Sequence, residues 1–446
     1  MSGQGRDVVI VGGGFSGTML AARLAERGAA ATVINRTPDF GLGVAYSTPF
    51  DGHLLNVRSG RMSALADQPG HFVDWLANTY PELADPDGFA PRRVYGHYVR
   101  DRLAAVEAAC PGLIRRHIGD VAAVEDDAVR LCDGSRIPAR AVVLATGNPA
   151  PKTAEAGTSN RIIGDPWASG ALDRIGMDDD VLIVGTGLTM VDMLLMLQGR
   201  GWRGRATALS RRGLMPRAHG ERPDPPLEPV PAMLTAPASE RLKVARSLAR
   251  DHGWREVMEG LRPITVDLWA QADIATRRRL VRHLRPFWDV HRHRLATVIG
   301  EAMDRLRDQG RLTVVTGRVR AITADDQGVR LDWRARRGEA APLIAPWLID
   351  CTGPGHAADA DPLTAPLIAS GRARLDPLRL GLDLDPMGRV LDREGRSDPS
   401  LFVLGPPSRA AFWESIAVPD IRQRIEHVIG ALAAQSELHV SKSIFQ

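Results

Sequence analysis

The sequence contains little cysteine, little lysine and no long apolar run. Its 3 cysteines, Cys110, Cys132 and Cys351, stand far apart and form no C-x-x-C pair, which excludes a dithiol redox centre and a cysteine-rich metal site. No uncharged run approaches the roughly 18 apolar residues that a membrane span needs. No basic and apolar leader precedes the first strand. We therefore expect a protein of the reducing cytoplasm, with no bound metal and no membrane contact.

Positive charge comes almost entirely from arginine. The formal net charge is +4, but the lysines are only Lys152, Lys243 and Lys442, and the arginines are scattered along the chain instead of forming one basic stripe. This distribution argues against a nucleic-acid partner. With 44% hydrophobic and 25% charged residues in a chain of 446, the composition is that of a globular protein too long for a single core.

The first nucleotide-binding signal is a glycine-rich turn between a strand and a helix. Residues 7–11 (DVVIV) are typical of a buried strand, and helical periodicity follows the turn as far as Gly28. The turn fits G-x-G-x-x-G, in which the glycines permit a tight turn, a close pyrophosphate and close packing of helix on strand. The helix start supplies free N–H groups for phosphates. The predicted dinucleotide contacts are Gly12, Gly14, Phe15, Ser16 and Gly17.

The next strand departs from the usual pattern at its end. It finishes in Asn35, where an acidic residue normally accepts a hydrogen bond from the adenosine ribose. An asparagine can still hydrogen-bond a ribose hydroxyl. It lacks the carboxylate, so we expect a weaker ribose contact at Asn35.

A second glycine turn, GTGLTM at residues 185–190, also follows a strand and opens a helix, although Met190 replaces the third glycine. The strand after that helix ends in Ser210-Arg211-Arg212. An arginine pair cannot accept from a 2′-hydroxyl but suits a 2′-phosphate, so NADPH is favoured over NADH; the alternative is that the arginines only cover the surface. We assign FAD to the first turn and NADPH to Gly185, Gly187, Leu188, Thr189, Ser210, Arg211 and Arg212.

The duplicated strand–turn–helix unit predicts an α/β fold with two Rossmann-like dinucleotide-binding domains and a helical insertion. The expected FAD domain comprises residues 1–160 and 340–446, with a linker at 148–160. The expected NAD(P) domain comprises residues 161–339. Its insertion at about 222–310 begins with a proline-rich loop and continues with helical patterns at 239–259 and 273–309.

Further segments carry a family resemblance spread over most of the chain. They include GGGFSGTMLAARL (12–24), GLGVAYST (41–48), HLLNVRSGRMSA (53–64), FAPRRVYGHYV (89–99), LATGNP (144–149), VLIVGTGLTMVD (181–192), ALSRRGLMPRAH (208–219), RHLRPFWDVHRHR (282–294), DCTGPG (350–355), and LFVLGP with FWESIAVPDIR (401–422). Together they resemble FAD/NAD(P)-binding flavoprotein monooxygenases, a family that includes FAD-dependent urate hydroxylases and aspartate N-monooxygenases.

The resemblance implies FAD, NAD(P)H, dioxygen and a small polar or anionic nitrogen-containing substrate. The compact length favours a urate-like substrate, with amino-acid N-hydroxylation as the other possibility. Segments that pass the flavin in such folds imply additional FAD contacts, although Asn56 could instead cap a turn. The terminal helix, which begins near Pro419, would point its N-terminus at the flavin. These additional contacts are His53, Asn56, Met62, Val121, Thr146, Gly147, Gly405, Trp413 and Val418.

Substrate contacts are expected in two arginine-rich segments. One contains Arg93, which either binds an anionic group or is solvated at a helix start. The other is the densest His/Arg cluster and contributes Trp288, His291 and Arg292, which either bind an anionic substrate or link the insertion to the flavin domain. A metal site is disfavoured because the i and i+2 histidines of a helix point apart.

Two rival functions remain open from the sequence. A reductase or dehydrogenase could pass electrons to another acceptor, since the missing C-x-x-C pair removes only disulfide reduction. A flavin-binding protein without catalysis would have a vestigial second site. The departures from the usual dinucleotide-binding pattern at Asn35 and Met190 are consistent with that interpretation.

Replacing Arg211 and Arg212 together by alanine tests the NADPH assignment. Charged hydrogen bonds to a phosphate contribute about 1.5–3 kcal/mol each, so the Michaelis constant for NADPH should rise far more than that for NADH. Steady-state kinetics with both cofactors measures this, and equal effects on the two would refute the assignment.

Overall fold

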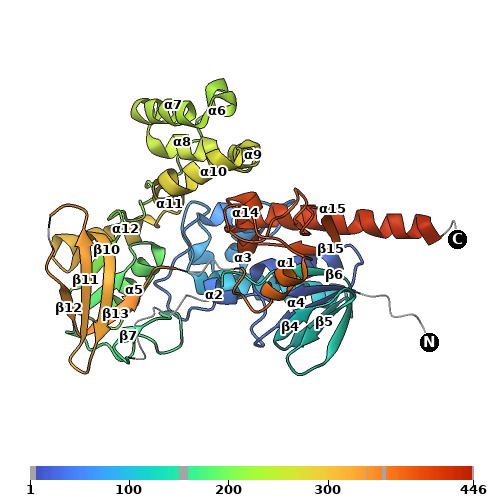
Figure 1. Cartoon of the computed structure of the whole chain (residues 1–446), viewed down its shortest axis with the longest axis horizontal. Coiled ribbons are helices and arrows are strands. Elements are labelled where there is room, and N and C mark those ends of the chain that lie inside the picture. The colour runs from blue at the N-terminus through green and yellow to red at the C-terminus, as the bar shows by residue number, and fades with distance from the viewer. Residues whose placement is uncertain (1–6, 150–158, 339, 354–357, 444–446) are drawn as a thin grey trace.

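Two β-sheets form the two ends of the molecule, and a lobe of helices projects from the region between them (Figure 1). The computed structural model describes residues 7–149, 159–338, 340–353 and 358–443. Most of the linker expected at 148–160 therefore lies outside the described residues. The elements nearest the N- and C-termini belong to the same end of the molecule, so the chain leaves this first domain and returns to it.

The first sheet is 8-stranded, in the order β14-β15-β6-β1-β2-β3, with β4 and β5 as a hairpin attached to β6. Neighbouring strands from β15 to β3 pair in parallel. The apolar residues of β1 are fully buried, as a continuous apolar run predicts. The strands are β1 (Asp7–Val11), β2 (Ala31–Asn35), β3 (Ile114–Ile118), β4 (Val121–Val124), β5 (Ala128–Leu131), β6 (Arg136–Leu144), β14 (Arg389–Leu391) and β15 (Ser397–Val403).

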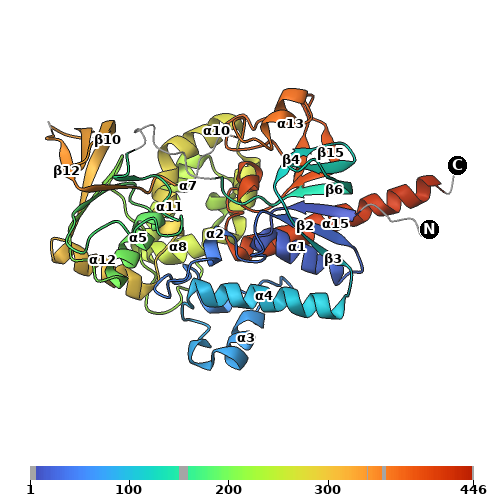
Figure 2. The same ribbon diagram turned by 90° about the horizontal axis from the view of Figure 1, so that it is seen from below.

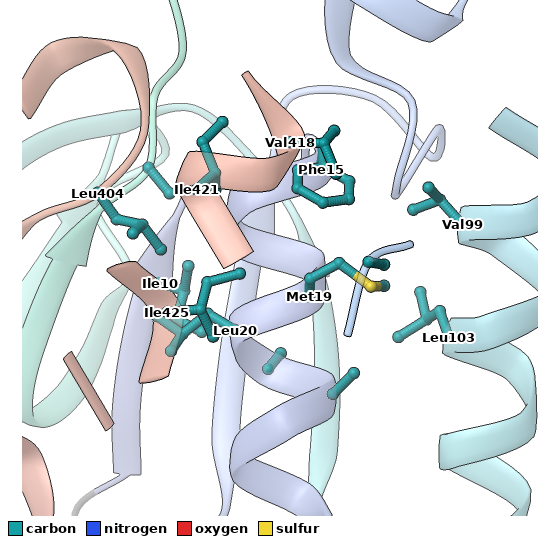
Figure 3. Close-up of a cluster of buried hydrophobic side chains, with 14 of the residues drawn as sticks. Ile10, Phe15, Met19, Leu20, Val99, Leu103, Leu404, Val418, Ile421 and Ile425 are labelled. Carbon is teal, nitrogen blue, oxygen red and sulfur yellow. The ribbon is translucent and has the colours of Figure 1, made fainter. Parts of the chain in front are cut away.

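Helix α1 is buried along its whole length and forms the centre of this domain. Figure 3 shows Leu20 in the core, with Val99 and Leu103 of α4 on one side and Ile421 and Ile425 of α15 on the other. The helices are α1 (Phe15–Ala25), α2 (Gly43–Tyr46), α3 (His71–Thr79), α4 (Arg92–Ala109), α13 (Ala365–Ser370), α14 (Arg409–Phe412) and α15 (Val418–Ser443), with short turns η1 (Ser59–Arg61), η2 (Pro81–Leu83) and η5 (Pro406–Ser408).

The second sheet is 7-stranded, in the order β12-β11-β10-β9-β8-β13-β7. Helix α5 (Leu188–Gly199) connects β8 to β9, and α12 (Thr297–Asp308) leads into β10. The strands are β7 (Ile162–Ile163), β8 (Val181–Val184), β9 (Ala206–Ser210), β10 (Leu312–Ala324), β11 (Val329–Ala335), β12 (Leu343–Ala345) and β13 (Trp347–Asp350).

The boundary expected at residue 339 is wrong by two strands, because β12 and β13 both belong to the second sheet. β13 pairs in parallel with β8 of the second sheet, as β6 pairs with β1 of the first. The duplication explains this pairing, because in each sheet a strand that is followed by Thr-Gly lies next to the strand that leads into the glycine turn. A Cβ on Gly12 would overlap the carbonyl oxygen of Ala145, and a Cβ on Gly185 would overlap that of Cys351.

The helical lobe comprises residues 231–292 and lies over the junction between the two sheets (Figures 1 and 2). The expected insertion extended to 310, but α12 packs against β10 and belongs to the second sheet. The two long helical patterns are divided, the first of them by Gly253 with φ of +106°. The lobe consists of α6 (Pro231–Thr235), α7 (Ala238–Asp251), α8 (Trp254–Leu261), η3 (Arg262–Ile264), α9 (Thr265–Gln271), α10 (Ile274–Arg279), the π-helical turn η4 (Leu280–Leu284) and α11 (Arg285–Arg292).

Within the ranges that the structure describes, no helix combines the length and the apolar character needed to cross a membrane.

Truncation of Leu20 tests the role of α1 as the centre of the first domain. Leu20 is 0% exposed, so Leu20→Ala should lower the free energy of unfolding by about 2–5 kcal/mol. Ile118, which is 59% exposed, provides the control, because Ile118→Ala should change it by less than about 0.5 kcal/mol. Chemical denaturation measures both, and equal effects would contradict this packing.

Candidate functional site

The first glycine turn has the geometry that a bound pyrophosphate requires. Gly12 has φ of +110°, and a Cβ on Gly17 would overlap the carbonyl oxygen of Gly12. Gly14 precedes α1, and no side chain caps its N-terminal N–H groups. These N–H groups are therefore free to bind an anion. The turn fits the phosphates of FAD.

Asn35 supports the turn itself. Its side-chain oxygen accepts a hydrogen bond from the Gly13 N–H at 3.2 Å, and its amide donates to the carbonyl oxygen of Thr37 at 2.9 Å. Asn35 therefore sits beside the nucleotide turn, as the sequence predicts, and part of its hydrogen-bonding capacity is used within the protein.

The second glycine turn is held by the end of the next strand. The Thr186 hydroxyl donates to Ser210 Oγ at 2.9 Å, and the Gly213 N–H donates to the same oxygen at 3.0 Å. Gly187 precedes α5 without a side-chain cap, and a Cβ there would meet nothing within 4 Å. Met190, which replaces the third glycine, is fully buried in the core of the second domain. Its side chain therefore does not fill the turn, which stays open to a nucleotide.

The two arginines after this strand differ in their surroundings. Arg211 is exposed and has no hydrogen bond or ion pair within the described parts of the chain. Arg212 donates to the carbonyl oxygen of Arg282 at 3.3 Å, and its guanidinium lies 5.3 Å from the ring centroid of Phe287. Arg211 is therefore free for a 2′-phosphate, whereas Arg212 also contacts the helical lobe.

The two domains are joined at Asp192 of α5. The Arg92 guanidinium donates to both carboxylate oxygens of Asp192, at 2.8 and 3.1 Å. The carbonyl oxygen of Asp192 lies 3.0 Å from His53 Nε2, and His53 Nδ1 lies 2.8 Å from the Thr48 hydroxyl. Burial lowers the pKa of His53, so the neutral ring donates from Nε2 to the carbonyl and accepts from Thr48 at Nδ1. His53, an expected flavin contact, thus lies in the contact between the domains.

A second contact joins the same segment to the second domain. The carbonyl oxygen of Asn56 accepts from His219 Nε2 at 3.1 Å, and Arg58 donates to the carbonyl oxygen of Gly220 at 2.6 Å. Burial lowers the pKa of His219 to about 4, so this ring is neutral near pH 7. Met62 ends the segment and is buried in the first domain.

The remaining predicted FAD contacts gather mainly at the carboxyl ends of the parallel strands. A Cβ on Gly405 would lie 2.6 Å from Ser16 Oγ, and Val418 opens α15 within the same core as Phe15 (Figure 3). Thr146 and Gly147 follow β6 at the same edge, where Gly147 has φ of +73°. Val121 begins β4 in the hairpin beside this edge.

A buried ion-pair cluster links the helical lobe to the start of α15. Trp288 Nε1 donates to Glu414 Oε1 at 2.6 Å, and Arg292 Nε lies 2.9 Å from Glu414 Oε2. Arg292 also lies 3.6 Å from Asp420, whose pKa is raised by burial. Trp288 and Arg292, expected either to contact substrate or to link the insertion to the flavin domain, are therefore both joined to the flavin domain by Glu414.

Arg262 completes this cluster and was not singled out from the sequence. Its side chain is 8% exposed, and its NH2 group makes no hydrogen bond with any residue that the structure describes. It forms an ion pair with Asp420 at 3.7 Å. Burial and the neighbouring Arg292 and Arg61 lower its pKa to about 9. The segment around Arg262 reads as an ordinary helix end in the sequence, and only the fold brings it to α15.

The last predicted substrate contacts occupy different places. Arg93 forms a surface ion pair with Asp51 at 2.7 Å. His291 packs edge-on against Trp254 in the helical lobe, with ring centroids 4.8 Å apart. The ring centroid of Trp413 lies 4.6 Å from that of Trp269 in the lobe. The described residues contain no group of three or more side chains that could hold a metal ion.

Removing the carboxylate of Asp192 tests the contact between the domains. Asp192→Ala leaves the guanidinium of Arg92 buried without its partner, which should lower the free energy of unfolding by about 3–5 kcal/mol. Asp178→Ala removes an exposed carboxylate 2.8 Å from Arg203 in the same domain and should change stability very little. If both variants unfold at the same denaturant concentration, the Asp192 contact does not hold the domains together.

Residues 9–149 match the protein family described as FAD-NAD(P)-binding. The whole fold is similar to that of an FAD-bound cadaverine monooxygenase from Erwinia amylovora, with a TM-score of 0.68, 14% identity, and coverage of 96% of this chain and 94% of that chain. It is similar to an ornithine hydroxylase from Pseudomonas aeruginosa (TM-score 0.65, 16% identity, 96% and 98% covered). A lysine monooxygenase from Nocardia farcinica is also similar (TM-score 0.58, 14% identity, 94% and 100% covered).

These likenesses confirm the predicted α/β fold with two Rossmann-like units. The chain thus has the two-dinucleotide fold of these flavoproteins, and the family matched by residues 9–149 agrees with FAD and NAD(P)H as its cofactors.

Proposed function

We propose that this protein is an FAD-dependent monooxygenase that takes hydride from NADPH and hydroxylates a nitrogen atom of a small amine-bearing substrate. The observation that carries the proposal is the pair of open, uncapped glycine turns at Gly14 and Gly187, one on each sheet, fixed in one frame by the Asp192 contacts. A single chain therefore offers sites for both the electron donor and the flavin.

The residues present fit these two nucleotides. The N–H groups at the start of α1 would bind the FAD pyrophosphate, with Ser16 and Gly405 beside them, and Arg211 would bind the 2′-phosphate of NADPH. The chemistry that bound FAD supplies is acceptance of hydride and transfer of electrons to dioxygen. The backbone N–H groups at the start of α15 would stabilise negative charge on the reduced ring, and the buried cations Arg262 and Arg292 lie beside that helix start.

Amine N-hydroxylation is favoured over oxidation of a urate-like molecule. The three similar structures act on cadaverine, ornithine and lysine, each of which offers an amine. The urate-like expectation rests on the family resemblance and on the compact length of the chain. A nitrogen-containing substrate is common to both readings, and the amine is the group that we propose to be oxidised.

The FAD-loaded protein mixed with NADPH and single amines tests this function. Ornithine, lysine, cadaverine, aspartate, phenylalanine, tryptophan and urate form the panel, and the readouts are NADPH oxidation and a product that has gained one oxygen atom. An amine should stimulate NADPH oxidation and yield a hydroxylamine. NADPH oxidation without any oxygenated product would instead identify a reductase, and the absence of NADPH oxidation would identify a non-catalytic flavin-binding protein.

A further inference from the structure

The helical lobe contains a partly open cavity of about 390 Å³, within the range of small-molecule sites. Its walls come from the helices of the lobe and from Trp413 of the first domain. Most of the lining is apolar, and four tryptophans contribute to it: Trp254, Trp269, Trp288 and Trp413. The size and aromatic walls suit a ring-bearing or similarly bulky apolar group.

Two helices of the lobe contribute little to a packed core. Neither α7 nor α10 buries a single residue. The apolar positions Leu242, Ala245 and Ala249 of α7 line the cavity instead. Because apolar helix faces gain stability only when they are removed from water, an apolar ligand in this space would supply the missing contacts.

The titratable side chains that line the cavity are all basic. They are Arg241, Arg246, Arg285 and His291, and none of the described residues that line the cavity carries a carboxylate side chain. Arg241 donates to the carbonyl oxygen of Ala236 at 2.6 Å, and Arg285 lies 3.4 Å from Asp289. Arg246, by contrast, makes no hydrogen bond or ion pair with any residue that the structure describes. The cavity thus suits an anionic group and disfavours a protonated diamine.

The cavity also adjoins the expected flavin site. Trp288 forms part of its wall and donates its indole N–H to Glu414, and Glu414 follows the wall residue Trp413. Trp413 and Glu414 lie a few positions before Val418, where α15 begins. A molecule in the cavity is therefore placed beside the helix start that would face the flavin.

We propose that this cavity binds the substrate, and that the substrate is an amine-bearing carboxylic acid with a bulky apolar, preferably aromatic, body. The identification of the ligand as the substrate rests on the proposed function, whereas the cavity and its ligand class do not. Basic amino acids and diamines, which the three similar proteins oxidise, fit neither the apolar walls nor the basic lining.

Isothermal titration of the FAD-loaded protein with three probes tests the ligand class. Indole-3-acetate combines the aromatic body with the carboxylate, tryptamine carries a cation on the same ring system, and acetate lacks the body. Indole-3-acetate should bind one to one and at least about tenfold more tightly than tryptamine, and acetate should not bind measurably. Equal affinities for indole-3-acetate and tryptamine would overturn the proposal.

Two variants locate the binding. Ala245→Trp fills the cavity and Arg246→Glu reverses the charge of its free cation, so each should weaken indole-3-acetate by at least about tenfold. Lys243→Glu makes the same kind of charge reversal at an exposed position of α7 outside the cavity and should leave the affinity unchanged. Binding that is unaffected by both cavity variants would overturn the site.

A failure of the proposed function can be distinguished from a failure of the proposed ligand class. If indole-3-acetate binds as expected but NADPH does not reduce the bound flavin, the monooxygenase assignment is wrong and the cavity remains a ligand site. If NADPH reduces the flavin but the probe does not bind, the substrate class is wrong.

Discussion

The ion pair between Arg92 and Asp192 is the contact on which the arrangement of the site depends. Arg92 is the first residue of α4 in the first domain, and Asp192 lies in α5, the helix that follows the second glycine turn. The pair is bidentate, and the two side chains are only 16% and 7% exposed. Because a buried charge left without its partner is costly, this contact fixes α5 relative to the FAD domain. The same contact would set the position of a bound nicotinamide nucleotide relative to the flavin.

The neighbouring contacts act in the same direction. His53 and His219 are held neutral by burial, and each forms a hydrogen bond with a carbonyl oxygen across the domain boundary. On the side of the lobe, Glu414 joins Trp288 and Arg292 to the start of α15. The expected flavin site is therefore enclosed by the first domain, by the second domain through α5, and by the helical lobe. Such an enclosure would exclude water from the oxidation.

The sequence predicted what short-range patterns encode. Both strand–turn–helix units, the start of the last helix and the fold class are correct, because they depend on glycine geometry and hydrophobic periodicity within a few residues. It could not predict contacts between distant positions: Arg92 and Asp192 are separated by 100 residues, and Trp288 and Glu414 by 126. The assignment of β13 to the second sheet was within reach, since its Thr-Gly ending repeats that of β6. No local sequence pattern predicts the position of Arg262 or the cavity in the helical lobe.

The central claim is that hydride passes from NADPH to FAD within this one chain. Anaerobic rapid mixing of the FAD-loaded protein with NADPH measures that step alone, without substrate or dioxygen. The account predicts loss of the oxidised-flavin absorbance in a single turnover, faster with NADPH than with NADH. Bound flavin that keeps its oxidised absorbance in the presence of excess NADPH would contradict it.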